Sequence, residues 1–257
     1  MGRAHEVRAA SMAATAAKKS ALCMRASKEI YMAAKSGGPD PVSNLALKAA
    51  IEKYKGQNLP KDVITRAIEK AKGGSQESYI QGRFEGFGAG NVAIIIDTLS
   101  DNANRAYVEV KTAVARKGGH LGTPGSVSYN FTEAGLLIFK SPKSVEEIEE
   151  LLIMSDVDVT EVTKDEDYIE VHVNPTAFGN AKSVLTNEAT KDKGGDTGWF
   201  NTGDMLEEFE KAEICMLPND YVKPSAEDLQ KFKDMLDLLD DCQDVQAVYH
   251  NCDMSEE

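Results

Sequence analysis

The sequence has little of several features that mark common classes of protein. Its 257 residues include four cysteines and one tryptophan, and no two cysteines form a CxxC pair. That spacing supports neither a disulfide scaffold nor a zinc finger, and it fits a reducing compartment. The longest apolar run, Val92–Ile96, is far shorter than the ~18 residues that cross a bilayer. We therefore expect a soluble protein with no membrane partner.

Recognisable catalytic motifs are also missing. The sequence has no P-loop, HExxH motif or nucleophile elbow, and its four histidines are widely separated. The acidic residues around Asp101 are too scattered to predict paired-carboxylate catalysis. Cys242, His250 and Cys252 match no common zinc spacing. We expect no catalytic residues, no cofactor and no metal.

Charge is divided unevenly along the chain. Residues 1–80 hold fourteen basic and seven acidic residues, whereas the other 177 residues hold fifteen basic and 35 acidic ones, within an overall charge of −13. Such a division favours a basic surface that binds an acidic partner. The alternative is that helices simply carry lysines on solvated faces, and charge alone leaves the two open.

The N-terminal segment has two interpretations. Met1–Ser27 is rich in Ala, Ser and Arg and poor in acidic residues, as organellar transit peptides are. A basic helical segment of a cytoplasmic protein is favoured. Arg3, His5 and Arg8 form a basic arm that is expected to order on a polyanion, or else to have no role.

The first 75 residues are predicted to be all helical. Apolar residues recur at helical spacing over Ala17–Ser36 and Val42–Lys55, and a third helix begins near Asn58–Pro60. Gly37–Pro39 ends the first helix. Short helices of this kind gain stability by packing together.

An α+β pattern follows the linker Gly73–Gln81. In chain order we predict a glycine-rich turn, a strand, a helix with Tyr107, Val110 and Val114 facing inward, and a second strand. Their ranges are Phe84–Gly88, Val92–Leu99, Asn102–Lys117 and Ser126–Phe131.

The next stretch is typical of a ferredoxin-like βαββαβ unit. Its predicted elements are Gly135–Phe139, Val145–Met154, Asp158–Thr163, Tyr168–Val173, Thr176–Leu185 and a strand near Glu207–Leu217. Lys191–Gly203 is predicted to be a loop and Ser225–Leu239 an amphipathic helix. The terminal strand, Val245–His250, has no sheet of its own, so we expect it to return to the sheet that begins at Val92.

A glycine-rich stretch near the middle of the chain is a candidate phosphate loop, because glycines allow a close backbone approach. The candidate residues are Gly118, Gly119, Gly122, Gly125 and Ser126. A tight connection with a type II turn at Pro124–Gly125 is the favoured alternative.

The candidate nucleic-acid contacts are the basic side chains that helical periodicity places away from the apolar faces, together with the N-terminal arm and the cations beside the glycine-rich stretch. They would contact phosphates and position the protein without determining sequence. These residues are Arg3, His5, Arg8, Lys18, Lys19, Arg25, Lys28, Lys35, Arg66, Lys70, Lys72, Arg116, Lys117 and His120.

Ten short motifs then run in order over nearly the whole chain. They are Met1–Arg8, Lys28–Tyr31, Gly38–Pro41, Asn58–Lys61, Ala67–Gly74, Glu85–Gly88, Leu99–Asn102, Asn104–Arg105, Gly122–Val127 and Val248–Asn251. In combination they resemble the YebC family, and within it the YeeN-type branch. Two features depart from the family: the start Gly2–Glu6 contains no aromatic residue that could stack on a base, and the loop Lys191–Gly203 is longer than usual.

The resemblance implies an α+β protein of three domains. These are an N-terminal helical domain (1–78), a central α+β domain (79–133 and 212–257) and an inserted ferredoxin-like domain (134–211). The family includes probable transcriptional regulators that bind DNA and the mitochondrial translational activator of cytochrome c oxidase subunit I. Some bacterial members are connected with ribosome function.

We therefore expect a cytoplasmic, non-enzymatic regulator of gene expression that binds DNA or ribosomal RNA, with the ribosome as a further partner. One alternative is a protein-interaction module that docks a basic partner through its acidic domains. The other is an enzyme that uses Gly122 and Asp101 on a phosphorylated substrate. The sequence does not separate DNA from RNA.

Overall fold

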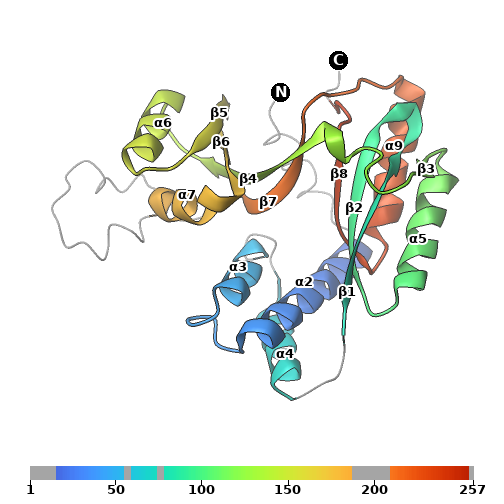
Figure 1. The fold of residues 1–257 in the computed structure, drawn as a ribbon, viewed down its shortest axis with the longest axis horizontal. Helices are drawn as coiled ribbons and strands as arrows, with labels where there is room; N and C mark the ends of the chain where they lie inside the picture. The colour runs from blue at the N-terminus through green and yellow to red at the C-terminus, as the bar shows by residue number, and fades with distance from the viewer. Residues whose placement is uncertain (1–15, 55–58, 74–77, 187–208, 255–257) are drawn as a thin grey trace. The chain divides into compact units, whose positions relative to one another are not determined.

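A computed structural model describes residues 16–54, 59–73, 78–186 and 209–254 (Figure 1). The chain divides into two compact units, which are described separately. The main unit lies within residues 14–132 and 217–257, and the insert unit lies within 133–216. Among the described helices, none is both long and apolar enough to span a membrane.

The main unit begins with a bundle of three helices, as the sequence predicts. They are α2 (Ala16–Gly37), α3 (Leu45–Lys53) and α4 (Lys61–Lys72), and α2 packs against the other two. Ala26, Ile30 and Ala34 repeat every four residues along α2 and are buried, so one face of this helix forms the centre of the bundle. The Asn44 side chain accepts a hydrogen bond from Leu47 N and caps α3.

A four-stranded antiparallel sheet follows the bundle. Its strands are β1 (Ile80–Phe87), β2 (Ala93–Ser100), β3 (His120–Leu121) and β8 (Val245–His250), in the order β3-β1-β2-β8. Because β8 pairs with β2, the predicted return of the terminal strand is confirmed.

Two helices cover one face of this sheet (Figure 1). They are α5 (Ala103–Arg116), capped by Asn102, and α9 (Ala226–Asp240), capped by Ser225. Ile94 and Ile96 from β2 pack with Val110 and Val114 from α5 and with Phe232 from α9. The β-branched run of β2 is thus buried between strands and helices.

Two predicted elements of the main unit were wrong. Phe84–Gly88 belongs mostly to strand β1 rather than to a turn. Gly86 is needed for close approach, since a Cβ there would lie 2.4 Å from the His120 carbonyl oxygen in β3. Ser126–Phe131 contains a 3-10 helix, Ser128–Asn130, in place of most of the predicted strand, because a side chain binds its backbone amides, as described below.

The insert unit has the element order βαββαβ. Its elements are β4 (Phe131–Lys140), α6 (Val145–Met154), β5 (Val159–Asp165), β6 (Tyr168–Val173), α7 (Phe178–Leu185) and β7 (Lys211–Pro218). The strands lie in the order β5-β6-β4-β7. A capping box between Ser144 and Glu147 starts α6. Leu137, Ile169 and Val171 pack against the helices to form the core. The predicted loop Lys191–Gly203 lies outside the described residues.

The close approach at Gly86 yields a prediction. We expect Gly86→Ala to lower the free energy of unfolding by about 1–3 kcal/mol, because the added methyl meets backbone atoms that cannot rotate away. Gly73→Ala is the matched control, since its Cβ would lie 3.5 Å from the nearest atom and stability should change by no more than about 0.5 kcal/mol. Urea denaturation followed by circular dichroism measures both. Equal effects of the two substitutions would contradict this account of Gly86.

Candidate nucleic-acid interface

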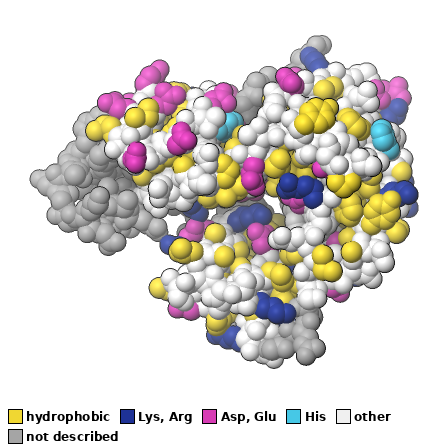
Figure 2. Space-filling model, in the orientation of Figure 1, with side chains coloured by type: hydrophobic (Ala, Val, Ile, Leu, Met, Phe, Trp, Pro, Cys, Tyr) yellow, Lys and Arg dark blue, Asp and Glu magenta, His cyan; other side chains and the backbone are white. Residues whose placement is uncertain are grey.

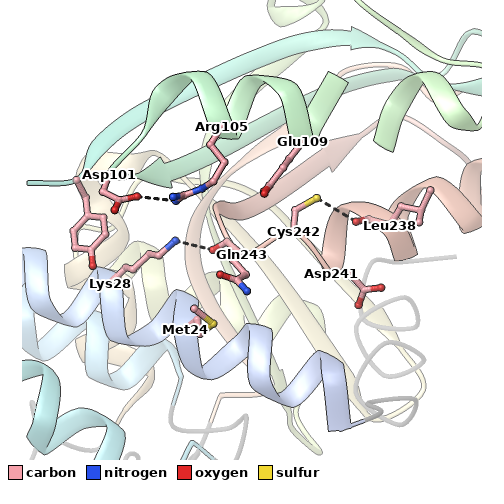
Figure 3. A pocket seen from close by; sticks show the side chains of 10 residues that line it. Met24, Lys28, Asp101, Arg105, Glu109, Leu238, Asp241, Cys242 and Gln243 are labelled. Atoms are coloured by element: carbon pink, nitrogen blue, oxygen red, sulfur yellow. Dashed lines mark hydrogen bonds and ion pairs between the residues drawn. The ribbon is translucent and has the colours of Figure 1, made fainter. Parts of the chain in front are cut away.

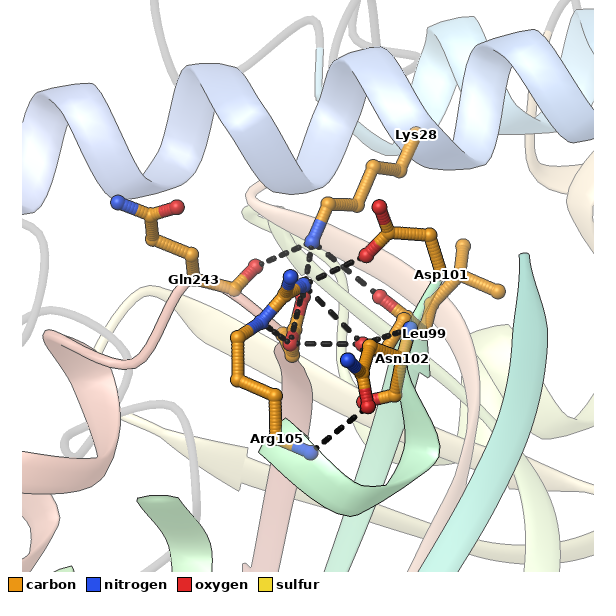
Figure 4. Close-up of polar contacts among 8 residues, drawn as sticks. Lys28, Leu99, Asp101, Asn102, Arg105 and Gln243 are labelled. Atoms are coloured by element: carbon orange, nitrogen blue, oxygen red, sulfur yellow. Dashed lines mark hydrogen bonds and ion pairs between the residues drawn. The ribbon is translucent and has the colours of Figure 1, made fainter. Parts of the chain in front are cut away.

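A buried carboxylate joins the helical bundle to the sheet, and Figure 4 labels Lys28 and Arg105, the two cations that bind it. Asp244, just before β8, is 1% exposed and accepts hydrogen bonds from Lys28 Nζ at 2.6 Å, Ser100 Oγ at 2.7 Å and Arg105 at 2.8 Å. Burial by itself raises the pKa of Asp244, but the hydrogen bonds from these three side chains outweigh it and the net pKa is lowered. Asp244 therefore remains ionised between two cations.

Two residues that the sequence predicts to contact phosphate, Arg25 and Lys28, bind groups of the protein itself at this junction. Lys28 Nζ also donates to the carbonyl oxygens of Leu99 and Gln243. Arg25, one turn earlier on α2, binds the carboxylate of Asp240 at 2.7 Å and its carbonyl oxygen. Both cations are largely buried and already neutralise carboxylates. The structure therefore gives Arg25 and Lys28 a role in attaching α2, which differs from the predicted phosphate contact.

A cavity of about 500 Å³ lies beside this junction (Figure 3). Its lining includes Arg105, Glu109, Asp241 and Cys242. Burial, followed by the negative charges of Glu109 and Asp241, raises the pKa of the Cys242 thiol to about 11. The thiol is thus protonated at neutral pH.

The glycine-rich stretch is closed by internal hydrogen bonds. The Glu85 carboxylate in β1 accepts the backbone N–H groups of Gly125, Val127 and Ser128 at 2.8 to 2.9 Å. The Ser126 N–H donates to the Thr123 carbonyl at 3.0 Å across a turn in which Gly125 has φ +89°, the geometry of the type II turn favoured from the sequence.

The other amides of the candidate phosphate loop also have partners. Gly118, Gly119 and Gly122 donate their N–H groups to carbonyl oxygens of Ala115, Val114 and Glu85 respectively. All five residues of the predicted loop therefore use their amides inside the protein, and the structure does not support phosphate binding there. Among these five residues only Gly125 donates to an anion, and that anion is the Glu85 carboxylate of the chain itself.

The predicted cations that remain on the surface of the bundle form the bundle patch, which consists of Lys35, Arg66, Lys70 and Lys72. Lys35 from α2 and Lys70 from α4 both lie over the ring of Tyr31, with Nζ 5.4 and 5.9 Å from its centroid. A basic side chain from each of two helices thus lies against the same ring. Arg66 pairs with Asp62 on the exposed side of α4. Figure 2 shows dark blue basic side chains over the bundle, in the lower part of the view.

The remaining predicted contacts differ in exposure. Arg116 and His120 are exposed at and just after the end of α5, while Lys117 forms an ion pair with Asp234 at 2.8 Å. Lys18 and Lys19 belong to α2, but their side chains are not described. Arg3, His5 and Arg8 lie outside the described residues.

Sequence reasoning missed two residues on α5. Tyr107, predicted to face inward, is 43% exposed, because the buried stripe of the helix is Ala106, Val110 and Val114. Lys111 lies one turn further on, with Nζ 5.5 Å from the Tyr107 ring centroid. The i, i+4 spacing of an aromatic and a basic residue was the available signal. In the described part of the chain, no group of three or more His, Cys, Asp or Glu is placed to hold a metal.

Known proteins resemble the chain over almost its full length. Residues 3–74 match the TACO1/YebC protein N-terminal domain, and residues 79–252 match the TACO1/YebC second and third domain. A probable transcriptional regulatory protein of Mesoplasma florum is 47% identical over 98% of this chain and 99% of its own. Another, from Vibrio parahaemolyticus, is 42% identical over 99% of this chain and all of its own.

A solved structure shares the fold. The crystal structure of a conserved hypothetical protein from Aquifex aeolicus has a TM-score of 0.74 and 30% sequence identity. The match covers 94% of this chain and 93% of that one. The mixed α+β class predicted from the sequence is confirmed by this match and by the two antiparallel sheets.

The Glu85 contacts predict a dependence on pH. Burial raises the pKa of Glu85, but the amides of Gly125, Val127 and Ser128 outweigh it, so the net pKa is lowered. A lowered pKa in the folded state means that the stabilisation is complete above the unfolded value and is lost as pH falls through the folded value. We therefore expect the free energy of unfolding to fall between about pH 5 and pH 3, partly through this group.

Glu85→Gln tests this contribution. The variant should lose about 1.5–3 kcal/mol at pH 7, because an amide side chain is a weaker acceptor than a carboxylate. Its stability should also depend less on pH than that of the unmodified protein. Urea denaturation from pH 7 to pH 3 measures both effects, with Glu69→Gln on the exposed side of α4 as the control. Parallel pH curves for the protein and Glu85→Gln would show that the amides do not act through the ionised form.

Proposed function

The chain belongs to the TACO1/YebC family, and from this premise we propose that it regulates gene expression by binding nucleic acid through the bundle patch. The relatives are named probable transcriptional regulatory proteins, which supports a regulatory role. In this proposal the protein acts in the cytoplasm by binding and performs no catalytic step.

The observation that carries the proposal is that Lys35 of α2 and Lys70 of α4 both lie against the ring of Tyr31, with Nζ 5.4 and 5.9 Å from its centroid. Both side chains are exposed, and each belongs to a different helix of the bundle, so the basic surface extends over more than one element. A phosphate backbone presents negative charges at regular intervals, which suits a surface with several exposed cations. The same third of the chain carries the net charge of +7, and the acidic remainder limits non-specific binding.

The exposed side of α4 suggests contact with phosphates rather than with base edges. Its exposed residues include Lys61, Asp62, Thr65, Arg66 and Lys70. Asn and Gln, which bind adenine through two hydrogen bonds, are absent from this helix. Recognition by shape and charge is compatible with duplex DNA, the ligand expected of a transcriptional regulator such as the relatives are named for. It is equally compatible with structured RNA of the ribosome. RNA is the second candidate.

A charge-reversal pair tests the proposal. Lys35→Glu with Lys70→Glu should weaken binding of a labelled 20-base-pair DNA or an RNA hairpin by roughly tenfold or more. It should also reduce the slope of log K against log salt by about 2, one unit for each phosphate contact. Fluorescence anisotropy from 50 to 300 mM salt measures both quantities.

The matched control changes the net charge equally at other sites. Lys140 is an exposed lysine over the ring of Tyr168, at 5.0 Å, and Lys231 lies on α9. Lys140→Glu with Lys231→Glu should leave the slope unchanged. If both double variants lose affinity to a similar extent, the effect is due to net charge alone. If Lys35→Glu with Lys70→Glu loses no affinity, the bundle patch is not the interface. Crosslinking in cells, with bound DNA and RNA sequenced in parallel, then separates the two candidates.

A further inference from the structure

The outer side of α5 carries an exposed surface that the bundle patch does not include. Exposed residues occupy two adjacent rows with i, i+4 spacing, which we call the α5 surface. One row contains Tyr107 and Lys111, and the other contains Val108, Thr112 and Arg116. Neither row contains an acidic residue. At about 1.5 Å per residue, the surface extends roughly 13 Å along the helix.

Tyr107 is held in place while part of it remains exposed. Its ring centroid lies 5.9 Å from that of Phe84, which packs against the core of the main unit, with 49° between the ring planes. The side chain is nevertheless 43% exposed, and Val108 beside it is 59% exposed. The Lys111 ammonium lies over the ring, 5.5 Å from its centroid, so a flat partner stacks on Tyr107 once the flexible lysine side chain moves aside.

The charges around this ring favour an anionic partner. Lys111 and Arg116 are exposed, and neither forms an ion pair with any acidic side chain among the described residues. The acidic residue of α5, Glu109, lines the cavity beside the Asp244 junction. Arg116 also lies in the last turn, where a cation stabilises the helix. Stabilisation of the helix end by Arg116 does not explain why the Tyr107 ring is exposed or why Lys111 lies beside it.

We propose that the α5 surface binds a single-stranded segment of nucleic acid, with an unpaired base stacked on Tyr107 and neighbouring phosphates at Lys111 and Arg116. The proposal rests on the nucleic-acid binding proposed above and adds the class of ligand. In a continuous duplex the faces of the bases are covered by their neighbours and offer nothing to this ring. An unpaired base offers a face, and stacking tolerates any base.

Tyr107→Ala in the full chain is the test. The affinity for a labelled oligouridylate of twelve nucleotides should fall roughly 5- to 150-fold, which is the range expected when one base–aromatic stack is lost. Binding of a twelve-base-pair duplex should not change. Tyr107→Phe keeps the ring and should retain the single-strand affinity. Tyr129→Ala, which removes another tyrosine of the main unit that is 77% exposed, is the control and should bind both ligands normally.

The outcomes separate this proposal from the proposed function. Unchanged single-strand binding by Tyr107→Ala, or an equal loss for duplex and single strand, overturns stacking on α5. Tyr107→Phe behaving like Tyr107→Ala also overturns it. If the unmodified protein binds the duplex but no single strand, the proposal for the α5 surface is wrong, whereas the proposed binding of nucleic acid is supported. If it binds neither, the proposed function fails and this proposal fails with it. Circular dichroism checks that each variant is folded.

Discussion

The carboxylate of Asp244 is the point on which the main unit depends. It is almost fully buried, and it receives hydrogen bonds from α2, from the end of β2 and from the first turn of α5. Loss of Lys28 or Arg105 would be costly, because the buried carboxylate would keep only part of the positive charge that balances it in a region of low dielectric. One side chain thereby fixes the helical bundle, the sheet and the start of a covering helix in a single arrangement.

This constraint divides the basic residues of the N-terminal third into two groups. Arg25 and Lys28 hold α2 against acidic residues of the C-terminal part. The partners of Asp240 and Asp244 do not include Lys35 and Lys70, each of which lies against the ring of Tyr31. Charge reversal at Arg25 or Lys28 is consequently a poor test of ligand binding, because it places an acid beside Asp240 or Asp244. The net charge of a segment therefore overstates the number of cations that face a partner.

Local patterns in the sequence were sufficient for most of the fold. Apolar residues at helical spacing located the bundle helices, and the β-branched run before Asp97 located β2. The site was less predictable, because its contacts join residues far apart in the sequence. Lys28 and Asp244 are separated by 216 positions, and no local pattern connects them. Glu85 looked like part of a glycine-rich turn, yet its carboxylate fills the loop that had seemed suited to phosphate.

The positions of β4 and β7 bear on how the two units came to share one chain. These strands carry the chain into and out of the insert unit, and they are neighbours in its sheet. Within the main unit, the Asn219 N–H donates to the Asn130 carbonyl at 2.9 Å, and Thr132 Oγ1 donates to Asn219 Oδ1 at 2.7 Å. The entry and exit points are therefore already joined on the main-unit side. A short turn between them would therefore be enough to close the main unit without moving any strand of its sheet.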